Sequence, residues 1–353
     1  MVHNTSAQNG VIRLAISAVL LLIALAVAGA TDLSGAGATF PYPLYSKWFD
    51  VYGQATGVHI NYQSIGSGGG IKALQTQTVD FGASDAPLSN EELKALPAPI
   101  EQIPMVAGAV VIAYNLSGVG KGLHLDAETM AGMFLGTITK WDDPKLVKLN
   151  PKVKLPNKQI IIAHRSDGSG TTYIFTHYLA AISPAWKTKV GAGKSVEWPV
   201  GIGGKGNEGV AGVIKQSDGS LGYVELAYAT QNNLPYADLK NKAGNFVEPT
   251  IASTTAAAAG YVNEMKKDIR VSIVNSPDKK AYPIAGFTYI MLYKAQSNAE
   301  KGKALVAFLS WAVHDGQKYA EALQYAPLPK TVVTLDEFEL KTITAAGQQL
   351  LGK

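Results

Sequence analysis

Three glycine-rich loops, each at a predicted helix start, constrain the fold of this chain more than any other feature. They cover residues 35–40, 66–70 and 167–171, and each combines glycine with serine or threonine. The second and third loops follow apolar segments at residues 58–62 and 160–163, which predict β-strands. Strands that lead through short loops into helices are typical of an α/β fold.

The other elements alternate in the same way along the 353 residues. Further strands are predicted at residues 110–114, 221–224 and 287–293. Helical patterns cover residues 43–54, 70–77, 90–95, 127–135, 171–181, 207–216, 297–314 and 317–323. We therefore expect sheets covered on both faces. The length suggests about two domains, and because no long linker separates them, we expect a cleft between them.

The three loops also predict binding of an anion. A helix start presents free backbone N–H groups and a partial positive charge, and glycine lets a ligand approach the backbone closely. Arg165 directly precedes the third loop and is, with Arg270, one of two arginines outside the N-terminal segment. A guanidinium grips an oxyanion with two parallel hydrogen bonds, which lysine does poorly. The alternative is that each loop is only a turn with a helix cap.

An acidic residue, Asp85, lies in the segment 81–87 among small residues. A carboxylate repels a fully deprotonated anion but accepts a hydrogen bond from a ligand that carries a proton. Asp85 therefore indicates a protonated oxyanion such as hydrogen phosphate. The alternative for Asp85 is a turn or a helix cap.

The N-terminus resembles a secretory signal peptide over residues 1–30, with Arg13, an apolar run at residues 14–27 and a small-residue site that predicts cleavage after Ala30. The alternative is a membrane anchor, but the run is shorter than the roughly 20 residues that span a bilayer. The chain has 0 cysteines, so neither a lipid anchor on cysteine nor a disulfide can form.

The charge distribution and the sequence motifs argue against several other functions. The net charge is +4 with lysines and acids interspersed, unlike the basic clusters of nucleic-acid-binding proteins. Residues 201–206 match the letters of a dinucleotide-binding loop, but Pro199 lies just upstream and the expected acid at a strand end is not evident. The G-x-S-x-G pattern of a nucleophile elbow around Ser169 would require glycine at residues 167 and 171, where Asp167 and Thr171 stand. Scattered histidines and no cysteine predict no metal site.

Five segments together resemble the periplasmic phosphate-binding proteins of high-affinity phosphate ABC transporters. They cover residues 34–40, 65–70, 80–87, 165–171 and 203–207, in the order and with the spacing of that family. The resemblance extends over nearly all of the chain after residue 30, whereas residues 231–285 and 330–353 match only loosely. The departures lie away from the ligand motifs and bear on docking to the transporter and on stability.

The resemblance implies a type II periplasmic-binding-protein fold, in which two α/β lobes enclose the ligand. We expect residues 31–105 plus 286–353 in lobe I and residues 106–285 in lobe II, with crossings near Val106 and Ala285. The implied function is capture of inorganic phosphate in the periplasm by a monomer and its delivery to the membrane permease and ATPase subunits of an ABC transporter. No cofactor, catalysis or nucleic acid is expected.

The resemblance also implies the residues of the site. The expected phosphate ligands are Thr39, Phe40, Ser67, Asp85, Arg165, Ser169, Gly170 and Thr171. Asp167 is expected to pair with Arg165 and to hold the guanidinium flat for the ion.

Two alternatives stand beside phosphate capture. An exported phosphatase could have a similar anion site, but it would need a nucleophile with a base, or metal ions. A binding protein for sulfate or molybdate would share the fold, and Asp85 argues against it because those ions carry no proton at neutral pH. Arsenate, which has the shape and protonation pattern of phosphate, is not distinguished.

Overall fold

The computed structural model describes residues 32–351 of the chain. The predicted signal peptide, residues 1–30, and its cleavage point lie outside the described residues. Among residues 32–351, no helix combines the length and the apolar character that crossing a bilayer requires.

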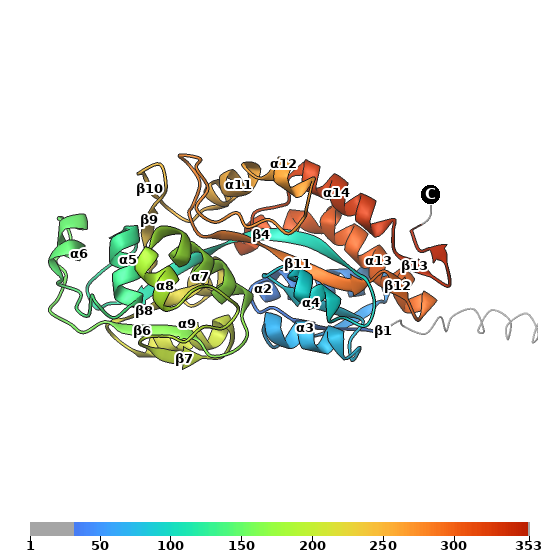
Figure 1. Ribbon diagram of the computed structural model, residues 1–353, viewed down its shortest axis with the longest axis horizontal. Coiled ribbons are helices and arrows are strands. Elements are labelled where there is room, and N and C mark those ends of the chain that lie inside the picture. The colour runs from blue at the N-terminus through green and yellow to red at the C-terminus, as the bar shows by residue number, and fades with distance from the viewer. Residues whose placement is uncertain (1–31, 352–353) are drawn as a thin grey trace, which may run out of the picture.

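An eight-stranded mixed sheet runs through the molecule (Figure 1). In spatial order its strands are β2 (His59–Ser64), β1 (Asp32–Gly37), β3 (Phe81–Ser84), β11 (Ala285–Tyr293), β4 (Ile100–Asn115), β8 (Ser220–Glu225), β6 (Ile161–Arg165) and β7 (Ile202–Gly204). β1 is parallel to β2 and β3, and β6 is parallel to β7 and β8. We call the part around β1, β2 and β3 lobe I and the part around β6, β7 and β8 lobe II.

The antiparallel strands β4 and β11 connect the two lobes. β4 has 16 residues, the first 15 of them buried, which at ~3.3 Å per residue span about 50 Å. Its first part pairs with β11 and its last six residues pair with β8. The crossings that we predicted near Val106 and Ala285 lie within β4 and at the start of β11, while the lobe boundaries stay a prediction.

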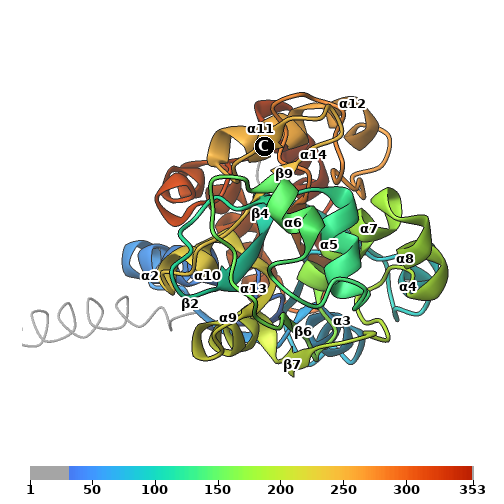
Figure 2. The same cartoon turned by 90° about the vertical axis from the view of Figure 1, so that its left-hand side faces the viewer.

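Helices flank both lobes (Figures 1 and 2). The α-helices are α2 (Tyr42–Thr56), α3 (Ser67–Gln75), α4 (Asn90–Lys94), α5 (Ala127–Phe134), α6 (Pro144–Leu149), α7 (Gly170–Ile182), α8 (Pro184–Lys189), α9 (Gly206–Gln216), α10 (Leu226–Gln231), α11 (Ile251–Ala259), α12 (Val262–Met265), α13 (Ala299–Val313) and α14 (Lys330–Leu340). α3 and α13 pack on β1, and α9 packs on β6, β7 and β8. Each lobe is thus an α/β unit, as the sequence predicts.

Short strands complete the fold in two small sheets. They are β5 (His124–Leu125), β9 (Asp238–Lys240) and β10 (Phe246–Val247) in one, and β12 (Ala295–Gln296), β13 (Thr344–Ala345) and β14 (Gln348–Gln349) in the other. The predicted helix at residues 317–323 is wrong in type, because this segment forms the 3₁₀ helices η1 (Asp315–Tyr319) and η2 (Glu321–Leu323).

The first glycine-rich loop was misjudged, because Gly35 and Gly37 belong to strand β1. A Cβ atom on Gly35 would lie 2.2 Å from the ring of Phe81, and Gly37 has φ +146° with Ala83 O 2.1 Å from the position of a Cβ. These glycines allow close packing between strands rather than approach of a ligand. The second helix also starts earlier than predicted, at Ser67 instead of residue 70.

Candidate functional site

The residues expected to bind the ligand follow strand ends in both lobes. Thr39 and Phe40 come after β1, Ser67 opens α3 after β2, and Asp85 follows β3. In lobe II, Arg165 is the last residue of β6, and Ser169, Gly170 and Thr171 form the start of α7. Ligands of open α/β sheets bind at the carboxyl ends of parallel strands, and the fold brings these ends of both lobes together.

Arg165 is the positive charge of this site. Its Nε donates to Asp167 Oδ1 at 2.7 Å, Nη2 donates to Asp167 Oδ2 at 2.5 Å, and Nη1 donates to Thr171 Oγ1 at 3.3 Å. The side chain is 1% exposed. Although burial alone would raise it, the guanidinium and the Gly206 N–H hold the pKa of Asp167 below its ordinary value. The pair fixes the plane of the guanidinium and favours the charged form of Asp167.

The two lobes touch at their glycine-rich corners. Ser67 Oγ of lobe I accepts from Gly170 N of lobe II at 3.0 Å and from Asp85 N at 3.2 Å. Gly68 N also donates to Gly168 O at 2.8 Å. A Cβ atom on Gly170 would lie 2.5 Å from Asp85 Oδ2, so glycine is needed there for the lobes to close. The Gly170 N–H, expected to face the ligand, thus donates to Ser67 in this structure.

Asn207, the second residue of α9, joins two of the expected ligands and was not predicted. Its Nδ2 donates to Thr39 Oγ1 at 2.8 Å and to Thr171 Oγ1 at 3.1 Å, and its backbone N donates to Thr39 Oγ1 at 3.1 Å. All three side chains are buried. The signal in the sequence was the segment 203–207, which we noted for its resemblance but did not connect with the site.

Three hydroxyl groups of the site share the same pattern of hydrogen bonds, in which the oxygen accepts two. The oxygen atoms of Thr39, Ser67 and Thr171 each accept from two N–H groups. A hydroxyl has two lone pairs and one hydrogen, and an N–H group can only donate. Each hydroxyl hydrogen must therefore point to another acceptor, and none is present among residues 32–351. The site offers three hydroxyl donors.

Asp85 is a buried acid beside this cluster, because its backbone N donates to Ser67 Oγ at 3.2 Å. It is 3% exposed, and its Oδ1 has no hydrogen-bond partner within the described part of the chain. Burial raises the pKa of Asp85 to about 7, although the Thr288 hydroxyl and the charge of Arg165 work in the opposite direction. A carboxylate close to neutrality at physiological pH can share one proton with a ligand oxygen.

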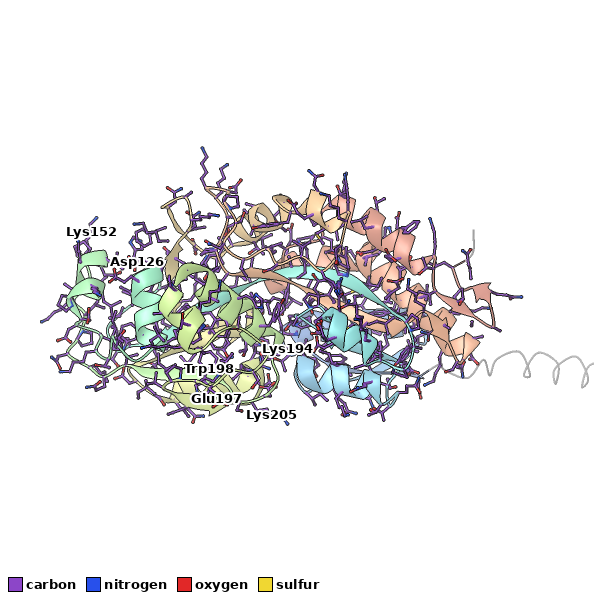
Figure 3. The ribbon with its side chains drawn as sticks, viewed as in Figure 1. Asp126, Lys152, Lys194, Glu197, Trp198 and Lys205 are labelled. Carbon is purple, nitrogen blue, oxygen red and sulfur yellow. The ribbon has the colours of Figure 1, made fainter. Side chains whose placement is uncertain are left out.

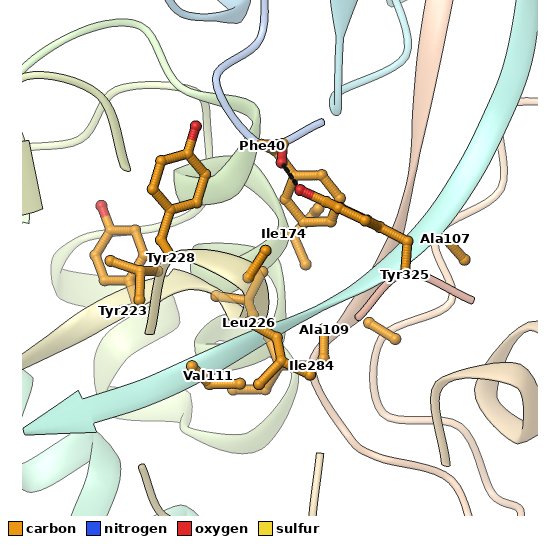
Figure 4. Packing of buried hydrophobic residues seen from close by; sticks show 14 of the residues in the cluster. Phe40, Ala107, Ala109, Val111, Ile174, Tyr223, Leu226, Tyr228, Ile284 and Tyr325 are labelled. Atoms are coloured by element: carbon orange, nitrogen blue, oxygen red, sulfur yellow. Dashed lines mark hydrogen bonds between the residues drawn. The ribbon is translucent and has the colours of Figure 1, made fainter. Parts of the chain in front are cut away.

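A second buried acid, Glu225, lies beside the site and was not predicted. Burial raises its pKa well above the ordinary value. Tyr325 Oη donates to Phe40 O at 2.7 Å (Figure 4) and to Glu225 Oε2 at 3.1 Å. Ala227 N also donates to Glu225 Oε2, at 2.8 Å. Burial thus favours the neutral form of Glu225, whereas the hydrogen bonds from Ala227 and Tyr325 favour the charged form.

Ser169 has a structural role at the start of α7. Its Oγ accepts from Thr172 N at 2.9 Å, which is a helix cap, while Thr172 Oγ1 contacts Tyr223 Oη at 2.6 Å. The alternative interpretation of this loop, a turn with a serine cap, is therefore correct for the Ser169 side chain. Its place as a phosphate ligand stays a prediction. Among residues 32–351 there is no group of three or more His, Cys, Asp or Glu side chains that could hold a metal ion.

The chain is similar to a known protein family and to two phosphate-binding proteins. The family described as PBP superfamily domain matches residues 26–315. The phosphate-binding protein PstS of Haemophilus influenzae is 48% identical over 92% of this chain and 97% of its own length. PstS of Xylella fastidiosa is 47% identical over 85% of this chain and 82% of its own.

A solved structure shares the fold at low sequence identity. It is described as a high-affinity periplasmic phosphate-binding protein bound with phosphate. The two structures superpose with a TM-score of 0.69 at 23% identity, over 87% of this chain and 93% of the other. The two-lobed architecture is thus that of periplasmic binding proteins.

Proposed function

Because the chain belongs to the PstS phosphate-binding proteins of the periplasmic-binding-protein superfamily, we propose that it binds inorganic phosphate between its lobes for import by an ABC transporter. The ligand is hydrogen phosphate or dihydrogen phosphate. The residues that bind this phosphate are Thr39, Phe40, Ser67, Asp85, Arg165, Ser169, Gly170 and Thr171. Asp167 pairs with Arg165 and orients its guanidinium.

The observation that carries this proposal is which groups of the cleft donate hydrogen bonds and which accept them. Three hydroxyls and Arg165 donate, while Asp85 offers an acceptor without a partner. Phosphate at neutral pH has oxygens that accept and at least one P–OH that donates, so it satisfies both kinds of group. Sulfate has no proton for Asp85, so at pH 7.5, where the charged form of Asp85 prevails, it would leave two acceptors facing each other.

An exported phosphatase is the less favoured function. The Ser169 hydroxyl caps a helix rather than contacting a base, and the relatives are named binding proteins. We therefore propose that the protein captures phosphate without turning over phosphate esters. Release of phosphate from a generic ester by the purified protein would overturn this part of the proposal.

The remaining parts of the proposal concern the protein's place in the cell. We propose that residues 1–30 are removed after Ala30 on export and that the mature chain works as a monomer in the periplasm without a lipid anchor, since it has 0 cysteines. Residues 31–105 plus 286–353 form lobe I and residues 106–285 form lobe II. The permease and ATPase subunits of the transporter are the partners.

The test is titration calorimetry of the mature protein, freed of bound ions by unfolding and refolding, with phosphate and with sulfate at pH 7.5. Phosphate is expected to bind at one site per chain, and sulfate is expected to bind far more weakly. Absence of phosphate binding, or sulfate binding of equal strength, would contradict the proposed function.

A further inference from the structure

The amide of Asn207 has one possible orientation in this structure. Its Oδ1 accepts from Glu225 N at 2.9 Å. Because a backbone N–H can only donate, the amide oxygen must face Glu225 and the NH₂ group must face the cleft. The chain fixes this orientation through the end of β8, a buried strand.

This orientation determines what Thr39 and Thr171 can do. Asn207 Nδ2 donates to both hydroxyl oxygens, at 2.8 and 3.1 Å. Asn207 N occupies the second acceptor position of Thr39, and Arg165 Nη1 occupies that of Thr171. Neither threonine can accept a further hydrogen bond from a ligand, so both can only donate.

We propose that Asn207 is a positioning residue that holds the Thr39 and Thr171 hydroxyls as donors, so that the cleft accepts only unprotonated ligand oxygens at these two points. The inference rests on the proposed phosphate function and adds a determinant of specificity to it. The ligand proton is then confined to the side of the cleft where Asp85 lies. A ligand with a hydroxyl at either threonine would place two donors against each other.

The same contacts couple the ligand to closure of the lobes. Thr39 belongs to lobe I, whereas Thr171 and Asn207 belong to lobe II. The Thr39 hydroxyl therefore reaches its fixed donor state only when Asn207 of the other lobe is in place. Phosphate binding and lobe closure are expected to favour each other through this amide.

The test is a double-mutant cycle on phosphate affinity. Asn207→Leu removes both donors at similar volume, and Thr39→Val with Thr171→Val removes both hydroxyls while keeping their shape. In the wild-type background, Asn207→Leu is expected to weaken phosphate binding by about 10- to 100-fold. In the double-valine background, the same change is expected to cost less than about 3-fold, because Asn207 acts through the hydroxyls.

A matched control is Asn150→Leu. Asn150 is also buried and also accepts one backbone N–H, from His124, and donates two bonds, to His124 O and Leu146 O. It is expected to lower the free energy of unfolding without changing phosphate affinity. An equal loss from Asn207→Leu in both backgrounds, or no loss in a folded Asn207→Leu protein, would overturn the inference.

Neutron diffraction of the unmodified protein with phosphate answers the same question if the variant does not fold. The expected result is deuterium of both threonine hydroxyls directed at phosphate oxygens and deuterium of Asn207 Nδ2 directed at the threonines. Threonine deuterium directed at Asn207 would overturn the inference. If the unmodified protein binds no phosphate, the proposed function fails first, so the two failures are distinguishable.

Discussion

Two arginine–aspartate pairs occupy contrasting regions of this protein. Arg165 pairs with Asp167 inside the cleft, and Arg270 pairs with Asp268 on the surface, each across two residues of sequence. In both pairs Nε and Nη2 contact the two carboxylate oxygens. The surroundings differ, since the Arg165 side chain is 1% exposed and that of Arg270 is 24% exposed.

The third nitrogen of each guanidinium shows what the difference means. Arg165 Nη1 donates to Thr171 Oγ1 in the cleft, whereas Arg270 Nη1 donates to Asn90 Oδ1 at 2.8 Å and to Leu88 O at 3.2 Å. Arg270 thus ties the segment before β11 to the loop after β3. Nearby, Lys194 of lobe II pairs with Glu92 of α4 at the boundary between the lobes (Figure 3). The interior pair serves the ligand, and the outer ion pairs hold surface segments together.

The largest expected effect comes from changing the interior arginine. Arg165→Lys keeps the charge but loses the two-nitrogen contact with Asp167, and it leaves a partly buried carboxylate poorly paired. Loss of a partner from a buried charge pair costs about 2–5 kcal/mol, so phosphate affinity is expected to fall by at least roughly 30-fold. Calorimetry measures this directly.

Arg270→Lys is the matched control for that change. It is expected to alter phosphate affinity by less than about 3-fold, because exposed pairs contribute about 0–1 kcal/mol. Equal losses in the two lysine variants would refute the division between interior and surface pairs.

A second prediction concerns stability, because the interior also holds an uncompensated acid. The folded-state pKa of Asp85, about 7, lies above its ordinary value of 3.8. The folded chain therefore binds more protons between these values, and stability is present below about pH 4 and is lost as the pH rises toward 7. Three pKa units correspond to at most about 4 kcal/mol.

Asp85→Asn cannot ionise and removes this loss. Urea unfolding of ligand-free protein is expected to show the variant gaining stability over wild type, with a larger gain at pH 8 than at pH 5. All other titrating groups cancel in the comparison of the two proteins. A gain that is the same at both pH values would mean that Asp85 has an ordinary pKa.

The same substitution is expected to reduce discrimination between anions. An amide at position 85 can donate to sulfate, which the carboxylate repels. The ratio of phosphate to sulfate affinity is expected to fall by about 5- to 150-fold, equivalent to about 1–3 kcal/mol for an unmatched buried group. Competition binding at pH 7.5 gives the ratio, and an unchanged ratio would remove the role assigned to Asp85.

The smallest effect is expected at the boundary of the lobes. Lys194→Met breaks the pair with Glu92 and is expected to weaken phosphate binding by less than about 5-fold, with the difference shrinking at high salt. Lys152→Met, an exposed site on lobe II far from this boundary (Figure 3), is the control and should have no effect. A loss as large as that of Arg165→Lys would make the outer pair, not the cleft, the main determinant of affinity.

Local features of this chain were predictable from sequence, and long-range ones were not. The corners at Ser67 and at residues 167–171 could be placed because glycine and a helix cap act within a few residues. Strand β1 was missed because its small residues are dictated by the ring of Phe81, a contact that only the fold creates. Asp85 could be singled out because an acid between anion-binding loops is unexpected.

Two residues next to the site, Asn207 and Glu225, could not be predicted from sequence because the fold alone creates their contacts. Asn207 reaches Thr39 across 168 residues of sequence, and Glu225 contacts Tyr325 across 100. Nothing in the neighbouring sequence indicates that the Glu225 carboxyl is buried. Hydrogen-bond polarity, which carries the specificity proposed for this cleft, becomes visible only when the partners from both lobes are known.

A crystal structure of the wild-type protein grown with phosphate tests the central claim most directly. The expected result is one phosphate between the lobes, with oxygens about 2.5–3.2 Å from Arg165 and the hydroxyls of Thr39, Ser67 and Thr171, and one oxygen at that distance from the Asp85 carboxylate. Phosphate held instead beside Arg270 and Lys194, or bound in the cleft with no oxygen near Asp85, would contradict it.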